Sequence, residues 1–277
     1  MKFSVIGGDL RLSNLAEMLT NDSNEVSVFG MEKSRGIEEN KRIIKCKNID
    51  EAIDNSNTII CSIPFMKNKE EMYATFSDKH IKINDLAKRD YKNKIFIAGG
   101  IPNDARKKLE NSFGKVIDIL KEEELIVLNT IATAEGAIDV AIQNTDIVIH
   151  GSNVLILGFG RVAKEVANKF YGLSAKVTCA ARKNTDLAWI KALGYKAVNI
   201  YELRDELKQY DIIINTVPKM IIDKEEMQYM NENVLLIDLA STPGGINIED
   251  AQKLNLKFVW ALALPRKSCT CYISKIH

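Results

Sequence analysis

The sequence predicts an α/β protein with two doubly wound parallel-sheet domains joined by a bridging helix. Short apolar strands alternate with helical patterns in both halves of the 277 residues, and this alternation is typical of parallel sheets covered by helices. An unusually apolar helical stretch separates the two halves. In the second half an apolar strand runs directly into a glycine-rich turn and another helix, which is the arrangement of a Rossmann dinucleotide-binding domain.

The first half, residues 1–128, is interpreted as a flavodoxin-like substrate domain. Ligands in such sheets lie at the carboxyl ends of the strands, so Gly7-Gly8-Asp9, Ser62-Ile63-Pro64 and Gly99-Gly100-Ile101 are expected to converge on one edge. Its elements are read from the apolar patterns and the turn residues that separate them. The expected strands are Phe3–Ile6, Glu25–Phe29, Thr58–Ser62, Ile95–Ala98 and Leu125–Leu128, and the expected helices are Leu12–Leu19, Glu51–Asn55 and Asp104–Asn111.

Residues 129–150 are expected to form the bridging helix, because Thr133–Asn144 is an apolar helical stretch. The second domain, 151–265, then repeats the alternation of strands and helices. Its expected strands are Val154–Leu157, Lys176–Ala180, Ile212–Thr216, Val234–Asp238 and Phe258–Trp260, with helices that include Asp186–Leu193 and Glu202–Leu207.

The glycine-rich turn has the pattern G-x-G-x-x-A, at Gly158, Gly160 and Ala163. Gly158 permits a tight turn, Gly160 lets the backbone approach a pyrophosphate, and Ala163 allows close packing of helix and strand. The helix that starts at Arg161 and Val162 offers its N–H groups and its positive dipole end to the phosphates. Because a strand precedes this turn and a helix follows it, nucleotide binding is favoured over a glycine turn without a ligand.

Two cations at the end of the next strand indicate which dinucleotide is bound. Sites for NAD usually place Asp or Glu there to bind the ribose 2′-hydroxyl, whereas this chain has Arg182-Lys183 at the strand end and no acid after it before Asp186. An arginine binds a 2′-phosphate through two hydrogen bonds, so NADP is favoured over NAD. The alternative is a solvated pair of surface cations.

Further candidate site residues follow other strands. Thr216 and Pro218 come after the third strand of the second domain, and Asp238 and Ala240 after the fourth; all four are predicted to bind the cofactor. Three residues are candidates for catalysis. Asp9 and Arg11 lie beside the first turn of the chain, and Glu135 lies in the first turn of the apolar helix; they offer proton transfer and a carboxylate anchor. Glu135 as a helix-dipole carboxylate and Arg11 as a surface residue are the alternatives.

The charge, the apolar runs and the cysteine content of the chain indicate which classes of partner are not expected. A net charge of +1 gives no reason to expect nucleic acid or a membrane, and no apolar run is expected to cross a bilayer. The start of the chain does not read as a signal peptide. The five cysteines include no CxxC pair, so no metal site is predicted. These features favour a cytoplasmic enzyme.

Taken together, several segments resemble the family of dipicolinate synthase A subunits. They extend in order from Met1 to about Pro265, and are Gly7-Gly8-Asp9-x-Arg11, Asn129-x-Ile131-x-Thr133-x-Glu135-Gly136, Thr145–Ser152, Leu157–Arg161, Ala181-Arg182, Asn215–Pro218 and Asp238-Leu239-Ala240-Ser241-x-Pro243-Gly244-Gly245. The resemblance implies an NADP-dependent oxidoreductase of a spore-forming bacterium, acting in the mother cell. It implies that a hydroxy-tetrahydrodipicolinate loses water and is oxidised to dipicolinate, a small dicarboxylate, with the flavoprotein-like B subunit of dipicolinate synthase as partner. A homo-oligomer is a further expectation.

The tail, residues 266–277, departs from the family pattern, in which Leu-Pro is followed by Gly-Lys-Val-Ala-Pro-Val-Thr-Ser-Ala-Lys-Tyr. Codons that encode Pro265–His277 return this pattern when one A is deleted from the Arg266 codon. A frameshift is therefore predicted; a divergent tail is the alternative.

Two other functions compete with this interpretation. The first is a D-2-hydroxyacid dehydrogenase-like enzyme, which shares the two-domain plan but needs a catalytic histidine late in the nucleotide domain. This chain has only His80, His150 and His277, and their positions argue against lactate-type chemistry. The second is a truncated, non-catalytic NADP-binding protein, which a turnover measurement separates from an enzyme.

Overall fold

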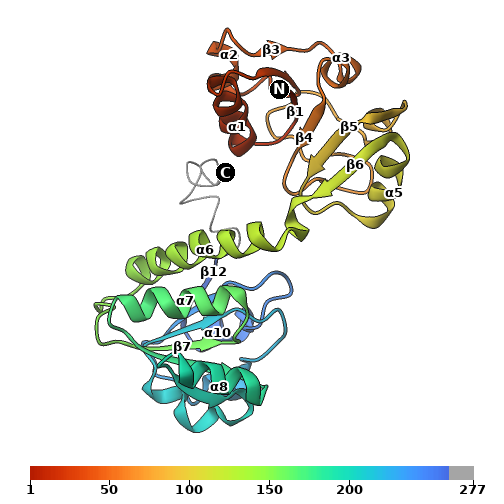
Figure 1. Cartoon of the computed structure of the whole chain (residues 1–277). Helices are drawn as coiled ribbons and strands as arrows, with labels where there is room; N and C mark the ends of the chain where they lie inside the picture. Colours follow the sequence, from red (N-terminus) through yellow and green to blue (C-terminus); the bar gives the residue numbers. More distant parts are fainter. Residues whose placement is uncertain (262–277) are drawn as a thin grey trace. The chain divides into compact units, whose positions relative to one another are not determined.

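The structure is a computed structural model that describes residues 1–261. The predicted frameshift after Pro265 therefore lies outside the described residues and stays a prediction. The chain forms two compact units, Met1–Ile126 and a second unit that begins at Val127, and each is described by itself (Figure 1).

The first unit is a six-stranded parallel sheet with the order β3-β2-β1-β4-β5-β6. This order is that of a Rossmann sheet, whereas a flavodoxin-like sheet has the order 2-1-3-4-5. Without the two-residue edge strand β3, however, the other five strands have the order 2-1-3-4-5 in chain order, so the sheet is compatible with the interpretation of this domain as flavodoxin-like. The strands are β1 (Lys2–Ile6), β2 (Glu25–Phe29), β3 (Ile44–Lys45), β4 (Thr58–Cys61), β5 (Tyr91–Ala98) and β6 (Phe113–Asp118); the helices are α1 (Leu10–Asn21), α2 (Arg35–Glu39), α3 (Ile49–Asp54), α4 (Ile83–Leu86) and α5 (Asn103–Ser112).

The second unit contains another six-stranded parallel sheet, and its order repeats that of the first. Read from one edge it is β9-β8-β7-β10-β11-β12. The strands are β7 (Asn153–Leu157), β8 (Lys176–Ala181), β9 (Lys196–Asn199), β10 (Ile212–Asn215), β11 (Leu235–Asp238) and β12 (Lys257–Trp260); the helices are α6 (Glu123–Asn144), α7 (Arg161–Gly172), α8 (Asn184–Ala192), α9 (Lys224–Met227) and α10 (Ile248–Lys253).

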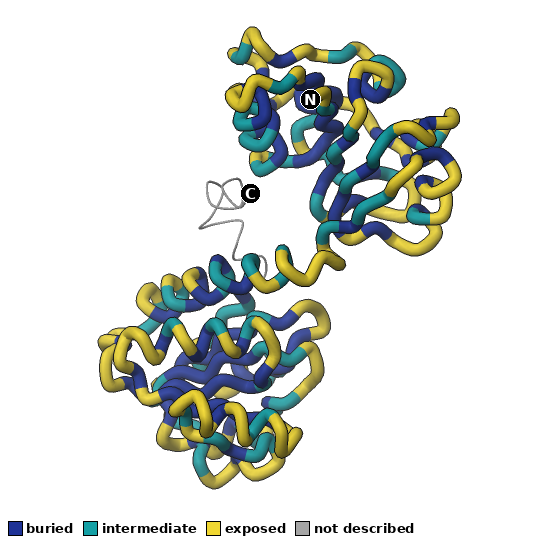
Figure 2. The backbone as a smooth tube through the Cα atoms, in the orientation of Figure 1, coloured by how far each residue is buried: buried dark blue, intermediate teal, exposed yellow. Residues whose placement is uncertain are grey.

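Helices cover both faces of each sheet, so the central strands are apolar on both sides. In β7, Val154 and Ile156 face a core that includes α6 and α7, while Leu155 and Leu157 face a core on the other side. Figure 1 shows α6 and α7 side by side over the sheet, and Figure 2 shows the buried strands beneath the exposed outer faces of the helices. Each unit thus has a core of its own.

Three predicted elements differ from the structure. Leu125–Leu128 was predicted as a strand but forms the first turns of α6, because a four-residue apolar run does not distinguish a strand from a buried helix. The last strand of the first sheet is instead β6, Phe113–Asp118. Residues 145–150 of the predicted bridging helix are not helical, and Glu202–Leu207 lies in two 3₁₀ turns, Ile200–Glu202 and Arg204–Gln209.

Helix α6 also corrects the expectation that no apolar run is long enough to cross a bilayer. Its 22 residues are long and apolar enough by length and composition alone. One such helix is weak evidence for a membrane span, because the core helix of a globular protein passes the same test. Its small residues Ala134, Ala137 and Ala141 are buried in the same core as Val166 and Phe170 of α7, so part of its apolar surface packs within the second unit.

Candidate functional site

The turn after β7 has the geometry that binds a dinucleotide. Gly158 has φ +97°, which favours glycine. A Cβ atom on Gly158 would lie 2.7 Å from the hydroxyl of Thr216, so the neighbouring strand end also requires glycine. The backbone N–H of Gly158 donates to the carbonyl of Ala180 at 2.9 Å, and this hydrogen bond ties the turn to β8. Ala163 is fully buried, which lets α7 pack closely on the sheet.

The space beside Gly160, where a pyrophosphate would lie, is not filled by other described residues. Gly160 is the N-cap residue of α7, has an extended backbone, and makes no side-chain capping hydrogen bond. A Cβ built on it would meet no atom within 4 Å. The first turn of α7 contains no acidic residue, and the first N–H groups of a helix have no partner within the helix itself. The turn therefore fits an anionic pyrophosphate.

The first unit has the equivalent turn, but its own side chains close it. Gly7 donates from its backbone N–H to Phe29 at 2.8 Å, as Gly158 does to Ala180. At the N-cap of α1, however, stands Asp9, whose carboxylate accepts a hydrogen bond from the N–H of Arg11 at 3.0 Å. A Cβ on Gly7 would clash with Met72 and Ala74 of a later loop. The second unit is therefore the one suited to a dinucleotide.

Asp9 and Arg11 form an ion pair at the carboxyl edge of the first sheet. The Nη2 atom of Arg11 lies 2.8 Å from Asp9 Oδ2, and Nε lies 3.1 Å from Oδ1. Arg11 also donates to the carbonyl of Ile63, and the N–H of Gly99 donates to Ser62 at 3.3 Å. The three segments expected to converge on this edge do converge, which confirms that prediction.

Asp118 is a residue at this edge that the sequence analysis missed. It ends β6, is 3% exposed, and accepts backbone hydrogen bonds from Gly100 at 2.8 Å, Ile101 at 3.0 Å and Leu120 at 3.2 Å. An acid at the end of a strand is its sequence signal, but that signal was lost with the strand Phe113–Asp118 itself.

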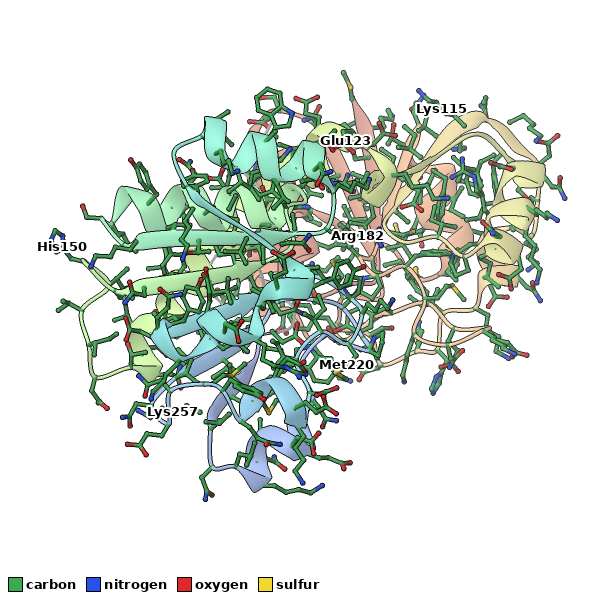
Figure 3. All side chains as sticks on the ribbon, turned by 90° about the horizontal axis from the view of Figure 1, so that it is seen from below. Lys115, Glu123, His150, Arg182, Met220 and Lys257 are labelled. Carbon is green, nitrogen blue, oxygen red and sulfur yellow. The ribbon has the colours of Figure 1, made fainter. Side chains whose placement is uncertain are left out.

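Arg182 and Lys183 follow β8 and are exposed. Neither is in an ion pair within residues 1–261. Figure 3 shows Arg182 and Met220 at the carboxyl ends of the strands of the second unit, and His150 and Lys257 at the opposite ends. The two cations thus stand at the edge where the glycine turn lies, and they are available to an anion.

The other predicted cofactor residues lie along the same edge. Thr216 donates through its hydroxyl to the carbonyl of Leu157 at 2.8 Å, which ties β10 to the end of β7. Pro218 is exposed. Asp238 and Ala240 are buried, at 1% and 4% exposure, and both oxygens of Asp238 accept hydrogen bonds from the chain itself.

Glu135 lies at a different place in the second unit. Its carboxylate is half exposed and pairs with Lys169 of α7 at 3.2 Å. Lys169 is eight residues beyond Arg161, so the pair lies about 12 Å along α7 from its N-terminus. The structure therefore brings Asp9 and Arg11 together and leaves Glu135 apart from the glycine turn.

The two described histidines lie in different units. His80 is an exposed residue of the first unit and pairs with Glu71 at 3.0 Å. Partial burial raises the pKa of Glu71, but the hydrogen bonds from His80 and Asn68 and the positive charges of His80 and Lys67 together make the net shift downward. His150 precedes β7 at the opposite end of the strands (Figure 3). Within residues 1–261 no group of three or more metal-ligating side chains gathers.

Comparison with known proteins decides the family. Residues 2–120 match the sequence model of the N-terminal domain of the dipicolinate synthase A subunit. Over 275 residues the chain is 32% identical to the dipicolinate synthase A subunit of Bacillus subtilis (strain 168), covering 96% of this chain and 89% of that protein. The chain belongs to the family of dipicolinate synthase A subunits.

Solved structures of dipicolinate synthase A subunits agree with this assignment. The crystal structure of the dipicolinate synthase A chain from Bacillus subtilis is 29% identical, with a TM-score of 0.87 and coverage of 99% of this chain and 92% of that one. The A subunit from Bacillus halodurans is 29% identical, with a TM-score of 0.85 and coverage of 99% and 94%. The α/β fold predicted for this family, with a Rossmann dinucleotide-binding domain second, is confirmed.

A second family model shows the general chemistry of this member of the dipicolinate synthase family. Residues 113–247 match the NAD-binding domain of D-isomer specific 2-hydroxyacid dehydrogenases. With the geometry of the Gly158–Gly160 turn, this makes the second unit a nicotinamide dinucleotide-binding domain and the chain an oxidoreductase.

Proposed function

We propose that this chain is the NADP-dependent oxidoreductase that forms dipicolinate during sporulation. Its substrate is a hydroxy-tetrahydrodipicolinate, which loses water to give a dihydrodipicolinate and then loses two hydrogens, one as a hydride and one as a proton. Family membership over almost the whole chain carries this proposal.

The proposed oxidation needs the protein mainly to position the substrate and the cofactor. When bound, NADP supplies the acceptor for the hydride. The product ring is aromatic, so removal of the two hydrogens is favourable, and holding the reactants in the right geometry supplies most of the rate.

Arg11 is the proposed anchor for one carboxylate of the substrate. Its guanidinium carries five N–H donors, and the hydrogen bonds to Asp9 and Ile63 use Nε and Nη2. Among the described residues 1–261, no hydrogen bond uses Nη1, which leaves this group for a carboxylate. Asp9 is the proposed proton acceptor at this edge, and Glu135, beside Lys169, is the second candidate.

The cofactor preference is the finer part of the proposal. Arg182 and Lys183 make no ion pair within the described residues, and no acid follows them before Asp186, so they support a 2′-phosphate. NADPH is expected to bind more tightly than NADH in a fluorescence titration. Arg182→Ala should remove most of that preference, by about tenfold or more, because a charge-assisted hydrogen bond is lost.

Lys257→Ala is the matched control for Arg182→Ala. Lys257 is a cation of the same unit, at the opposite ends of the strands (Figure 3), and pairs with Asp146 at 3.2 Å. Its loss should leave the preference for NADPH unchanged. Equal affinities of the parent chain for NADPH and NADH would refute the NADP assignment.

The proposal also includes a partner and a compartment. The chain acts with the B subunit of dipicolinate synthase, a flavoprotein-like protein, in the cytoplasm of the mother cell, and associates with copies of itself. These statements rest on the family to which the chain belongs.

A coupled reaction tests the function. Aspartate semialdehyde, pyruvate, the upstream synthase, NADP and the flavoprotein-like partner are mixed with the full chain, and the appearance of ultraviolet-absorbing dipicolinate is followed. Product that depends on this chain and on NADP supports the proposal. Binding of NADPH without any product, also in a frame-restored chain, would favour a non-catalytic NADP-binding protein instead. A 2-hydroxyacid dehydrogenase would oxidise a 2-hydroxy acid instead; His150 of the second unit lies at the ends of the strands opposite the cofactor edge (Figure 3).

A further inference from the structure

The buried carboxylate of Asp238 joins several backbone segments at the carboxyl edge of the second sheet. Its Oδ1 accepts hydrogen bonds from Asn215 Nδ2 at 2.8 Å and from the N–H of Ala240 at 2.9 Å. Its Oδ2 accepts from the N–H groups of Gly245 at 2.7 Å and Ile246 at 3.1 Å. We call these five residues the Asp238 hub.

All four partners in the Asp238 hub are N–H donors. A carboxylate only accepts hydrogen bonds, so it satisfies every one of them. An asparagine at this position would turn its own NH₂ group towards two of the donors. Buried donors without an acceptor are costly, so Asp238→Asn should displace the segments that the hub holds.

One of these segments lies against the glycine turn. Asn215 donates from Nδ2 to the carbonyl of Val217 at 3.0 Å and accepts from its N–H at 3.0 Å. Thr216, between them, donates from its N–H and its hydroxyl to Leu157, at 3.1 and 2.8 Å. A Cβ on Gly158 would touch Thr216 and Val217. The segment after β10 thus lies beside the turn, while the turn itself is held to β8 by the hydrogen bond of Gly158 to Ala180.

The glycine pair after β11 is explained by the same contacts. A Cβ on Gly245 would lie 2.5 Å from Asn215 Nδ2 and 2.6 Å from the carbonyl of Val217. A Cβ on Gly244 would lie 2.9 Å from Asp238 Oδ2. The close approach leaves no room for a side chain, and it fixes the position of the loop after β11.

The Asp238 hub belongs to one half of the dinucleotide site. A Rossmann sheet consists of two mononucleotide-binding halves. The glycine turn and Arg182 belong to the half formed by β7, β8 and β9, which holds the adenosine. The hub joins β10, β11 and β12, since the carbonyl of Asp238 also accepts from Ala261 at 2.9 Å and that of Ala240 from the Trp260 indole at 3.1 Å.

We propose that Asp238 is a positioning residue for the nicotinamide half of the cofactor, which acts by holding the segments after β10 and β11 and does not itself contact the cofactor. The proposal rests on the proposed function, since it takes NADP as the ligand of the second unit.

The test compares a whole and a half cofactor. Asp238→Asn in the full chain is titrated with NADPH and with adenosine diphosphate ribose 2′-phosphate, which lacks the nicotinamide. NADPH should bind about tenfold more weakly, because buried donors lose their acceptor, while the affinity for the half cofactor stays within about twofold. Asn215→Ala removes the side chain that joins Asp238 to the segment after β10, and it should weaken NADPH binding without weakening binding of the half cofactor. If Asp238→Asn does not fold, the two affinities of Asn215→Ala decide the test.

Asp118→Asn is the matched control. Asp118 is also a buried strand-end carboxylate that accepts several backbone hydrogen bonds, but it lies in the first unit. It should lower the melting temperature to a similar degree and leave both affinities unchanged. Unchanged NADPH affinity in Asp238→Asn, or an equal loss of both ligands, would overturn the proposal. A parent chain that binds no NADPH would instead overturn the proposed function, and the proposal with it.

Discussion

Individual glycines in this chain have separable roles. Gly158 has a positive φ and is enclosed by Thr216 and Val217, whereas Gly160 has an ordinary extended backbone and open space around it. The G-x-G-x-x-A pattern was enough to find Gly158 and Gly160, because the conformation of such a turn depends on residues that are close in the sequence. It was not enough to separate the glycine that the fold needs from the one that the ligand needs.

Alanine substitutions should separate these two roles. Gly158→Ala forces a Cβ to within 2.7 Å of the Thr216 hydroxyl at positive φ, and should lower the free energy of unfolding by about 1–3 kcal/mol. Gly160→Ala meets nothing in the protein, and should leave the unfolding free energy within about 0.5 kcal/mol while it weakens NADPH binding. Denaturant unfolding and NADPH titration of both variants check this. Equal stability losses would contradict it.

Other residues of the site could not be assigned from the sequence, because their roles depend on distant partners. Asp238 was predicted as a cofactor residue from its place after a strand, and only the fold brings Asn215 and Gly245 to its oxygens. Glu135 was selected for the helix that carries it, and its partner Lys169 lies on another helix. A pattern in one segment contains no information on such contacts.

At the scale of elements, the N-cap residue distinguishes two otherwise equivalent helices. Helix α1 begins after Asp9, whose carboxylate occupies the N-terminus, and α7 begins after Gly160, which leaves its N-terminus open. Both helices follow the first strand of a sheet with the same order. Strand order was beyond sequence analysis, because it depends on pairings between distant segments, and the short edge strand β3 was not predicted for the same reason.

Gly160→Asp should place a carboxylate at the N-cap of α7, as Asp9 does at the N-cap of α1. The open space and extended backbone at this position accept the side chain. An aspartate N-cap is more favourable than a glycine N-cap by roughly a few tenths of a kcal/mol, so the melting temperature should hold or rise slightly. NADPH binding should be lost, because a carboxylate then repels the pyrophosphate. Gly160→Ala adds a Cβ without charge and should bind better than Gly160→Asp; the reverse order would count against the electrostatic account.

At the scale of the whole molecule, the two units have separate cores and are expected to respond separately to the cofactor. Cys61 lies in the core of the first unit and Cys179 in the core of the second. Burial raises the pKa of the Cys179 thiol to about 12 and raises that of Cys61 well above its ordinary value. Both thiols should therefore react with iodoacetamide only when their unit opens.

NADPH should protect one of these two cysteines. Ligand binding stabilises the unit that holds the ligand, so saturating NADPH should slow the alkylation of Cys179 in mild denaturant and leave the rate at Cys61 nearly unchanged. Mass spectrometry of the two peptides measures each rate in the full chain. Protection of Cys61 alone would place the cofactor in the first unit and contradict the assignment.

The central claim is that only the second of the two similarly folded units binds the dinucleotide, and that it prefers NADP. Calorimetric titration of NADPH and NADH into the full chain tests it most directly. We expect one NADPH site per chain, tighter binding of NADPH than of NADH, and no binding by Gly160→Asp. Two sites per chain, or NADPH binding that survives Gly160→Asp, would contradict it.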